Sequence, residues 1–356
     1  MTRLPFFSIF ALISAISILS AGTLTVAAET DTPAEIRIEN LTLPPANLPL
    51  VMVQVKNMTD APLTGELAID VPESWRMAAT TKPVELEAGA TDRVAFAVEK
   101  GSTLSINRYP IGATLTVGDK EITTSRTVVA AAAPYYKPTV DGETDDWNDA
   151  IPVRFSADED VPTTIVSTYW NRRTFYVLVE VEEEKLITRG DAPQFDAVQI
   201  AIAPRKTVTG TEPTDTSERF EFLVVPTGDG AGTCYRLASP GDTLADTQVA
   251  SELTDEQEEP RSEVAVARRD GKTIYEVGIS FTPIRSTISP SEGREFRMSL
   301  LVHDPDGTGV RDWGASVGLK PGPNSQYSWS RWTGEKGSAK DYCDSKTSWG
   351  MCSSKY

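Results

Sequence analysis

The sequence has few residues that could bind zinc or haem iron. Its 356 residues include a single histidine, His303, and three cysteines, none of them spaced as Cys-x-x-Cys. Structural zinc sites use local pairs of Cys and His, and haem iron needs an axial side chain of a similar kind. The composition therefore disfavours both a zinc site and a haem site.

Basic residues are scarce relative to acidic ones. The chain holds 34 Lys and Arg against 51 Asp and Glu, which gives a formal net charge of −17. Because a surface of this sign repels phosphates, the charge argues against a nucleic-acid partner. It is compatible with binding calcium or neutral glycans.

Long apolar runs are absent beyond the first residues. Arg3 precedes an apolar run from Phe6 to Ser20, and small residues follow up to Ala28. This pattern predicts a signal peptide over residues 1–28, with an uncleaved anchor as the alternative. No other run approaches the ~20 apolar residues of a spanning helix. We therefore expect a secreted, periplasmic or cell-surface protein that has no membrane insertion after cleavage.

Long helical periodicity is also missing, and alternation of apolar and polar residues takes its place. Between residues 34 and 133, seven short alternating runs are separated by turn residues, which predicts an immunoglobulin-like β-sandwich. We expect Trp75 to lie in its core. The apolar positions of the runs are Ile36/Ile38, Val51/Val53/Val55, Leu67/Ile69/Val71, Val84/Leu86, Val94/Phe96/Val98, Ala113/Leu115/Val117 and Thr127/Val129.

A second β-rich domain is predicted over residues 138–335, after an Ala- and Pro-rich joint at 129–138. Alternation in the run from Phe296 to Val302 places its apolar residues inward and His303 on the opposite side, at a loop edge. The expected strands cover residues 163–170, 175–181, 197–202, 220–225, 263–267, 274–279 and 296–302, with a weaker run through Val317.

The cysteines near the end of the sequence suggest a disulfide. Cys343 and Cys352 bracket a short loop in a tail that spans residues 336–356, whereas Cys234 stands alone. In an oxidising compartment we expect Cys343 and Cys352 to pair. Two free thiols in a frayed tail are the alternative.

Acidic residues gather beside turn glycines in two places. Asp304-x-Asp306-Gly307 sets two carboxylates two residues apart, and Asp141 and Glu143 belong to a denser cluster before Trp147. Calcium takes six to eight oxygen ligands, so carboxylates in turns suit it. We predict structural calcium with Asp141, Glu143, Asp304 and Asp306 as candidate ligands.

Five motifs of the second domain occur in an order that resembles the family 9 carbohydrate-binding modules, which are DOMON-type β-sandwiches. The resemblance implies a jelly-roll-like antiparallel β-sandwich that carries structural calcium and binds glycan ends. The first domain resembles the immunoglobulin-like modules of exported carbohydrate-active proteins. The motifs are Val140-Asp-Gly-Glu with Asp146-Trp147, Tyr169-Trp170-Asn171 before Thr174-Phe-Tyr-Val-Leu-Val, Phe195-Asp196-Ala-Val-Gln-Ile200, Tyr275-Glu276-Val-Gly-Ile279 and Val302-His-Asp304-Pro-Asp306-Gly307.

Sugar recognition needs aromatic faces against pyranose C–H groups, and polar side chains that bond the hydroxyls. A loop rich in Gly, Pro and Ser carries such residues, and the resemblance places a sugar-stacking side chain at Trp329. The family's partner Trp is replaced by Pro193, so Phe195 either substitutes for it or belongs to the core. Candidate sugar-binding residues are Trp329, Trp332, Tyr327, Asn324, Arg331, Phe195 and Trp313, whereas Trp147 and Trp170 are expected inside.

Evidence for an enzyme is weak in this sequence. Gly314-Ala-Ser316-Val-Gly318 matches the pattern of a nucleophile elbow, but the prolines that follow prevent the required helix, and the single histidine precedes the serine. A glycosidase would need two flanking carboxylates, and nothing marks such a pair among so many acids.

We therefore expect an all-β, exported, non-catalytic protein that binds a poly- or oligosaccharide. A cell-envelope scaffold with a protein partner is the first alternative, and an exported glycan-active hydrolase is the second.

Overall fold

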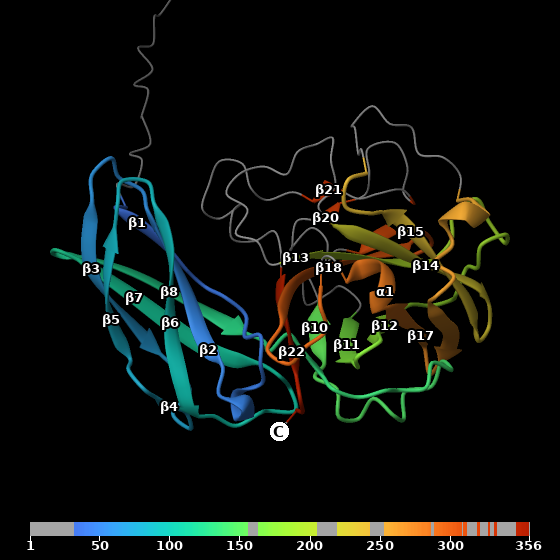
Figure 1. Ribbon diagram of the computed structural model, residues 1–356, viewed down its shortest axis with the longest axis horizontal. Coiled ribbons are helices and arrows are strands. Elements are labelled where there is room, and N and C mark those ends of the chain that lie inside the picture. The colour runs from blue at the N-terminus through green and yellow to red at the C-terminus, as the bar shows by residue number, and fades with distance from the viewer. Residues whose placement is uncertain are drawn as a thin grey trace, which may run out of the picture. The chain divides into compact units, whose positions relative to one another are not determined.

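The protein is almost entirely β-strand in its computed structural model (Figure 1). Side chains are not described for residues 155, 309–311, 319–320, 331–332 and 347. Among the residues described, α1 (Phe281–Ile284) is the one α-helix, and no helix has the length and apolar character needed to cross a membrane. The structure describes residues 32–155, 163–204, 219–242, 253–285, 288–307, 309–311, 319–320, 327, 331–332 and 347–355.

Residues 34–128 form two antiparallel four-stranded sheets, as the seven alternating runs predict. One sheet has the order β1-β2-β6-β4, and the other has the order β5-β3-β7-β8. Strand β2 alternates strictly between buried and half-exposed positions from Val51 onward, which is the pattern of a strand with one core face. The strands are β1 (Ala34–Ile38), β2 (Leu50–Asn57), β3 (Leu63–Asp70), β4 (Arg76–Met77), β5 (Thr81–Leu86), β6 (Thr91–Lys100), β7 (Tyr109–Val117) and β8 (Lys120–Val128).

One hydrophobic cluster fills the space between these sheets. Val53, Phe96 and Leu115 are fully buried in it. Trp75 belongs to the same cluster and packs against Tyr109 with ring centroids 5.4 Å apart, which confirms its predicted core position. Asn57 is also buried, and its side-chain amide donates to the carbonyl oxygens of Ala61 and Glu87. It therefore links two turns of the first sandwich.

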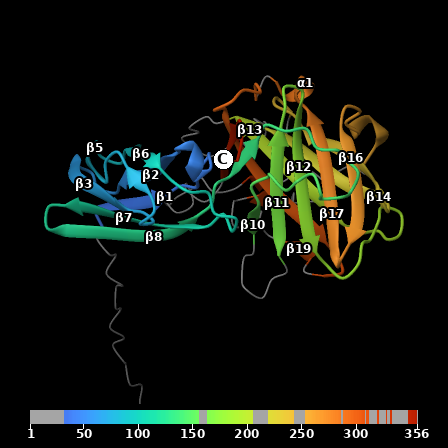
Figure 2. The same ribbon diagram turned by 90° about the horizontal axis from the view of Figure 1, so that it is seen from below.

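Two larger sheets follow, one of five strands and one of seven. The five-stranded sheet has the order β10-β11-β12-β17-β16, and Figure 2 shows β11, β12, β17 and β16 side by side. The larger sheet has the order β15-β14-β13-β18-β22-β9, and β19 also pairs with β18. The strands are β9 (Ala132–Pro134), β10 (Val153–Phe155), β11 (Thr164–Trp170), β12 (Thr174–Glu182), β13 (Ala197–Pro204), β14 (Phe220–Gly228), β15 (Ala231–Ala238), β16 (Glu263–Arg269), β17 (Lys272–Ser280), β18 (Glu295–Asp304), β19 (Gly309–Arg311), β20 (Leu319–Lys320), β21 (Arg331–Trp332) and β22 (Thr347–Cys352).

The predicted inward residues of these strands meet in one core. Phe175, Val177 and Val179 of β12 lie in the same buried cluster as Phe296 and the other apolar residues that alternate along β18. All seven runs expected between residues 163 and 302 are strands, whereas Val317 lies outside the described residues. The all-β fold class is therefore confirmed.

The predicted place of His303 at a loop edge is wrong. Its side chain is fully buried, as are Ser299 and Leu301 on the same side of β18. The alternation assigned this side of the sheet to solvent, but its apolar side chains form two further buried clusters, and residues outside the sheet such as Leu253 and Tyr327 pack against one of them. We call this side, which carries Gln199 of β13 and Glu221 of β14, the distal face of the seven-stranded sheet.

The acidic stretch that opens the second β region is fixed by one buried carboxylate. Glu276 of β17 accepts hydrogen bonds from the backbone N–H groups of Asp141 (2.9 Å) and Gly142 (2.5 Å) and from the indole N–H of Trp147 (2.6 Å). Trp147 stacks on Tyr169, with centroids 4.9 Å apart, so its predicted interior position is confirmed. Burial raises the pKa of Glu276, and the hydrogen bonds oppose this shift.

A strand from the end of the sequence completes the larger sheet. β22 lies between β18 and β9, and it pairs with β9 in parallel, an exception to the antiparallel sandwich expected. Trp349 and Met351 of β22 are fully buried in the core of the larger sheets. Cys352 at the end of β22 is buried beside the cluster of the first sandwich.

The Cys343–Cys352 disulfide stays a prediction. Cys352 has a free, buried thiol whose pKa burial raises to about 12, while Cys343 lies outside the described residues. The boundary predicted between two domains also stays a prediction, since Pro33–Tyr356 form one compact unit.

Candidate functional site

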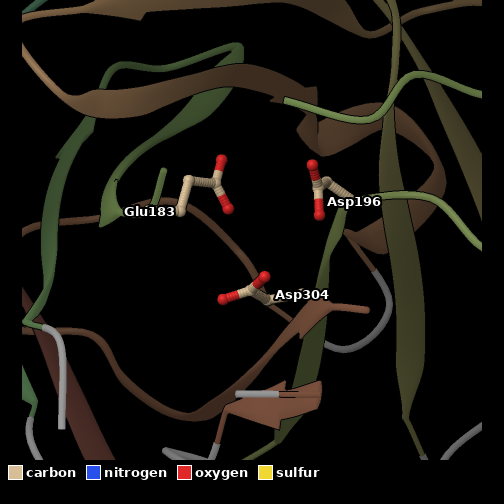
Figure 3. Close-up of side chains that lie close together, drawn as sticks. All are labelled: Glu183, Asp196 and Asp304. Carbon is tan, nitrogen blue, oxygen red and sulfur yellow. The ribbon is translucent and has the colours of Figure 1, made fainter. Parts of the chain in front are cut away.

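Three carboxylates converge at one end of the larger sheets. One oxygen each of Glu183, Asp196 and Asp304 lies within 4.8 Å of the others, and Figure 3 shows the three groups directed toward a common centre. Asp196 and Asp304 are fully buried. Among the described residues this is the one group of three or more His, Cys, Asp or Glu side chains with such spacing. We call it the carboxylate trio.

The register of two strands explains why two of these residues meet. Ala197 of β13 pairs with His303 of β18 in an antiparallel ladder. One step further along both strands, Asp196 and Asp304 therefore lie opposite each other. Glu183 comes from the other sheet, directly after β12. The trio thus joins the two sheets of the sandwich at one end of their strands.

Backbone groups orient both buried carboxylates of the trio. The N–H of Ile187 donates to Oδ2 of Asp196 at 2.5 Å, and the N–H of Gly307 donates to Oδ1 of Asp304 at 2.9 Å. A Cβ at position 307 would lie 2.4 Å from the Asp304 carboxylate, so any other residue there would displace that carboxylate. The turn residue of the Asp304-x-Asp306-Gly307 motif therefore serves the geometry of Asp304.

The trio fits a hard divalent cation. Three like charges within 4.8 Å repel one another strongly when two of them are buried, and a bound cation would offset that repulsion. All three ligands offer oxygen, which suits calcium better than zinc. Glu183, Asp196 and Asp304 would hold the ion, and backbone oxygens or water would complete its coordination.

The other predicted metal ligands lie outside the trio. Asp306 forms an ion pair with Lys185, 3.1 Å apart. Asp141 caps its own turn by accepting from the N–H of Glu143, and the Glu143 carboxylate pairs with Arg269 at 3.0 Å. Of the four calcium ligands predicted from the sequence, the trio contains Asp304 alone, and the sequence prediction did not name Glu183 or Asp196 as ligands.

Next to the trio, a line of polar side chains crosses the distal face. Arg219 donates to Glu221, Glu221 accepts from Nε2 of Gln199 at 2.8 Å, and Oε1 of Gln199 lies 3.0 Å from Nε2 of His303. All four side chains are buried. We call them the polar row. His303 directly precedes the trio residue Asp304, so the trio and the row share a strand end.

The polar row sets the tautomer of His303. Because an ionised carboxylate only accepts, Gln199 must turn its amide N–H toward Glu221 and its oxygen toward His303. Nε2 of His303 therefore carries the proton, and Nδ1 is a bare acceptor. Burial lowers the pKa of His303 to about 4, consistent with a neutral ring. Within the described part of the chain, Nδ1 of His303 and Oγ of Ser299 have no hydrogen-bond partner.

An aromatic pair borders the polar row. The rings of Phe195 and Tyr327 stack with centroids 4.0 Å apart and planes inclined by 9°. The Tyr327 hydroxyl donates to the carbonyl oxygen of Phe195 and accepts from its N–H, both at 2.7 Å. Tyr327 also lies 5.3 Å from the ring of His303. Phe195 is buried, whereas Tyr327 is half-buried.

The structure describes the side chains of two of the seven predicted sugar-binding residues. The structure brings together two of them, Phe195 and Tyr327, and it confirms the interior position of Trp170. Trp313, Asn324 and Trp329 lie outside the described residues. Arg331 and Trp332 form β21, which pairs with β20, and their side chains are not described.

Comparisons with known proteins give distant likenesses in structure alone. A scan for known protein families finds no match, and neither does a search of curated proteins. Two solved structures of a family 9 carbohydrate-binding module from Caldicellulosiruptor kristjanssonii, one with cellotriose and one with glucose, are 15% and 14% identical to this chain. They cover 62% of this chain and 92% and 94% of their own, both with a TM-score of 0.38. The calcium-binding domain CBD12 of CALX1.1 is 9% identical over 70% of this chain and 72% of its own, with a TM-score of 0.19. None of these likenesses assigns the chain to a family.

Proposed function

We propose that this is an exported, non-catalytic carbohydrate-binding protein whose ligand site lies on the distal face and whose carboxylate trio binds structural calcium. The observation that carries the proposal is the adjacency of the trio, the polar row and the Phe195–Tyr327 pair. Asp196 follows Phe195 in the chain, and Asp304 follows His303. A cation held by the trio would therefore fix the backbone next to Phe195 of the aromatic pair and next to His303 of the polar row.

The chemistry of the distal face suits a ligand rich in hydroxyl groups. Burying a polar atom without a hydrogen bond costs about 1–3 kcal/mol, and this cost applies to Nδ1 of His303 and Oγ of Ser299. Both atoms are fully buried, so a sugar could offer separate hydroxyl groups to them only by displacing the side chains that cover this face. Tyr327 is only half-buried, and its ring, which stacks on Phe195, is the aromatic group we propose for the apolar face of a pyranose.

The five ordered motifs of the sequence give further support, because they meet in space. Glu276 of the fourth motif accepts hydrogen bonds from Asp141, Gly142 and Trp147 of the first, and Trp147 stacks on Tyr169 of the second. Asp196 of the third motif and Asp304 of the fifth converge in the trio. The motifs thus make two connected clusters, as expected if the resemblance to carbohydrate-binding modules reflects a shared arrangement.

Binding to a panel of neutral poly- and oligosaccharides, including cellotriose, tests the proposal. We expect the wild-type protein to bind at least one sugar in calcium and more weakly in chelator. Tyr327→Ala should reduce binding by about tenfold, since one aromatic contact contributes about 0.5–1.5 kcal/mol beyond its area. Tyr135→Ala, at an exposed ring elsewhere, serves as the matched control. No binding to any sugar in calcium would refute the proposal.

A cell-envelope scaffold is the second candidate, and the burial of Phe195 favours it. A ring that is fully packed against Tyr327 and the distal face cannot itself stack on a sugar. If the protein acts as a scaffold, no glycan is retained, and capture of an envelope protein survives the change Trp329→Ala.

A further inference from the structure

The trio residue Glu183 stands on a segment without regular structure. β12 ends at Glu182, and residues 183–188 have no place in a strand or helix. By contrast, Asp196 and Asp304 are fixed by neighbouring strands and by backbone N–H groups. The geometry of the trio therefore depends on whatever holds the backbone at Glu183.

Arg268 supplies that hold from the β16–β17 hairpin. Its Nη2 donates to the carbonyl oxygen of Glu183 at 2.6 Å and to that of Glu184 at 2.5 Å. Its Nη1 lies 3.4 Å from Oγ1 of Thr273 on the neighbouring strand. One guanidinium group thus clamps two successive peptide units, including that of Glu183.

The hairpin that carries Arg268 is itself well defined. Asp270 and Gly271 form its turn with φ values of 47° and 80°, the left-handed pair that a tight two-residue turn requires. On one side of the hairpin, a Cβ at Gly142 would lie 2.7 Å from the Cβ of Ala267. The arginine therefore projects from a packed element toward an irregular one.

The next residue, Arg269, makes a natural comparison. Its guanidinium pairs with Glu143 at 3.0 Å and lies 3.4 Å from Asp229. No contact between Arg269 and the Glu183 segment is found among the described residues. The two arginines have the same charge and lie on the same strand, but Arg268 contacts backbone carbonyl oxygens and Arg269 contacts carboxylates. Arg269 is therefore a matched control for Arg268.

We propose that Arg268 is a positioning residue for calcium: by clamping the backbone at Glu183, it holds that carboxylate against Asp196 and Asp304. The proposal rests on the calcium site of the proposed function. A purely electrostatic role predicts the opposite sign, because removing a cation near three carboxylates strengthens calcium binding. The direction of the change therefore separates the two roles.

The experiment measures calcium affinity by titration calorimetry in the full protein and in Arg268→Met, Arg268→Lys and Arg269→Met. We expect Arg268→Met to weaken binding by about tenfold, the lower end of the effect of losing a group that orients a ligand. Arg268→Lys keeps the charge but loses the rigid planar fork and the second nitrogen that lies near Thr273, so it should weaken binding by about threefold. Arg269→Met should change it by less than about twofold.

A second readout reports the geometry directly. Europium luminescence lifetimes in H₂O and D₂O count the water molecules on an ion that replaces calcium. We expect Arg268→Met and Glu183→Gln each to add about one water relative to wild type, since both withdraw the same ligand. Unchanged melting temperatures of the calcium-free variants would show that the fold is intact, and Arg268→Lys provides the test if the Met variant does not fold.

The proposal is overturned if Arg268→Met binds calcium as tightly as wild type or more tightly, or if both arginine variants lose affinity equally. It also falls if the wild-type protein binds no calcium. Sugar binding is measured on the same samples, so a failure of Arg268 as a positioning residue is distinguished from a failure of the carbohydrate-binding function.

Discussion

His303 is the residue whose protonation tests the buried polar row most directly. Burial lowers its pKa from the ordinary 6.5 to about 4. On acidification the unfolded chain therefore takes up this proton first, and the folded state loses stability as the pH falls from 6.5 to 4. The full loss is about 3 kcal/mol. Above pH 6.5 this contribution is constant.

Because the chain has one histidine, NMR follows its imidazole without ambiguity. We expect a titration midpoint near pH 4, and a midpoint near 6.5 would contradict the buried position. In urea denaturation, the stability difference between wild type and His303→Gln should shrink as the pH falls through this window. The carboxylates titrate in the wild type and in His303→Gln alike, so their contribution to the pH dependence of stability cancels in the difference between the two proteins.

Glu276 is the second residue whose role can be isolated. Glu276→Gln keeps the shape of the side chain but replaces one accepting oxygen by a donor, which opposes the N–H groups of Gly142 or Trp147. Hydrogen bonds to charged groups contribute about 1.5–3 kcal/mol. We expect the free energy of unfolding to fall by about 2–3 kcal/mol in urea denaturation. Glu263→Gln, at an exposed site on the adjacent strand, should leave it within about 0.5 kcal/mol.

At the scale of elements, β22 can be tested through its buried tryptophan. Trp349 is fully buried, and its indole N–H donates to Oγ1 of Thr168 at 2.8 Å. Trp349→Ala should lower the free energy of unfolding by about 3–5 kcal/mol, as large core truncations do. Ser348→Ala, one residue away and half-buried, is the control. Equal stability of the two variants would show that β22 contributes little to the core.

Strands with clear alternation could be predicted from the sequence, and others could not. In β12 and β18 apolar residues recur at every second position, so their core faces were found. β15 reads Ala-Gly-Thr-Cys-Tyr-Arg-Leu-Ala, in which small and polar residues hide the pattern. β22 lies in a short segment rich in Ser and Lys that suggested a tail. His303 was misplaced because alternation shows which residues share a face and cannot show what covers it.

The carboxylate trio shows why a site resists sequence reasoning. Asp304 stood out because a glycine turn follows it. Asp196 reaches the site only through the pairing of β13 with β18, and Glu183 reaches it from the other sheet. Neither residue has a local signal, since acidic residues are common in this chain. Predicting the trio would have required the strand order.

For the whole molecule, calcium should act as a stabiliser. A ligand that binds only the folded state at about 100-fold above its Kd adds about 2.7 kcal/mol. We therefore expect scanning calorimetry to give a melting temperature several degrees higher in calcium than in chelator. The double variant Asp196→Asn/Asp304→Asn should show no such shift. If it shows the wild-type shift, the ion is bound elsewhere on this acidic chain.

The place of β22 has a consequence for the time course of folding. Cys352 contacts the carbonyl oxygen of Ala133 across 219 residues of sequence, and Trp170 bonds the carbonyl oxygen of Cys352 across 182. Contacts between such remote residues slow folding, because the entropy of closing a long loop is lost before the strand pairing contributes any stabilising free energy. Until β22 docks, β18 and β9 remain open strand edges that can accept the same segment from another copy. Productive folding is therefore a competition between loop closure within one chain and strand exchange between chains.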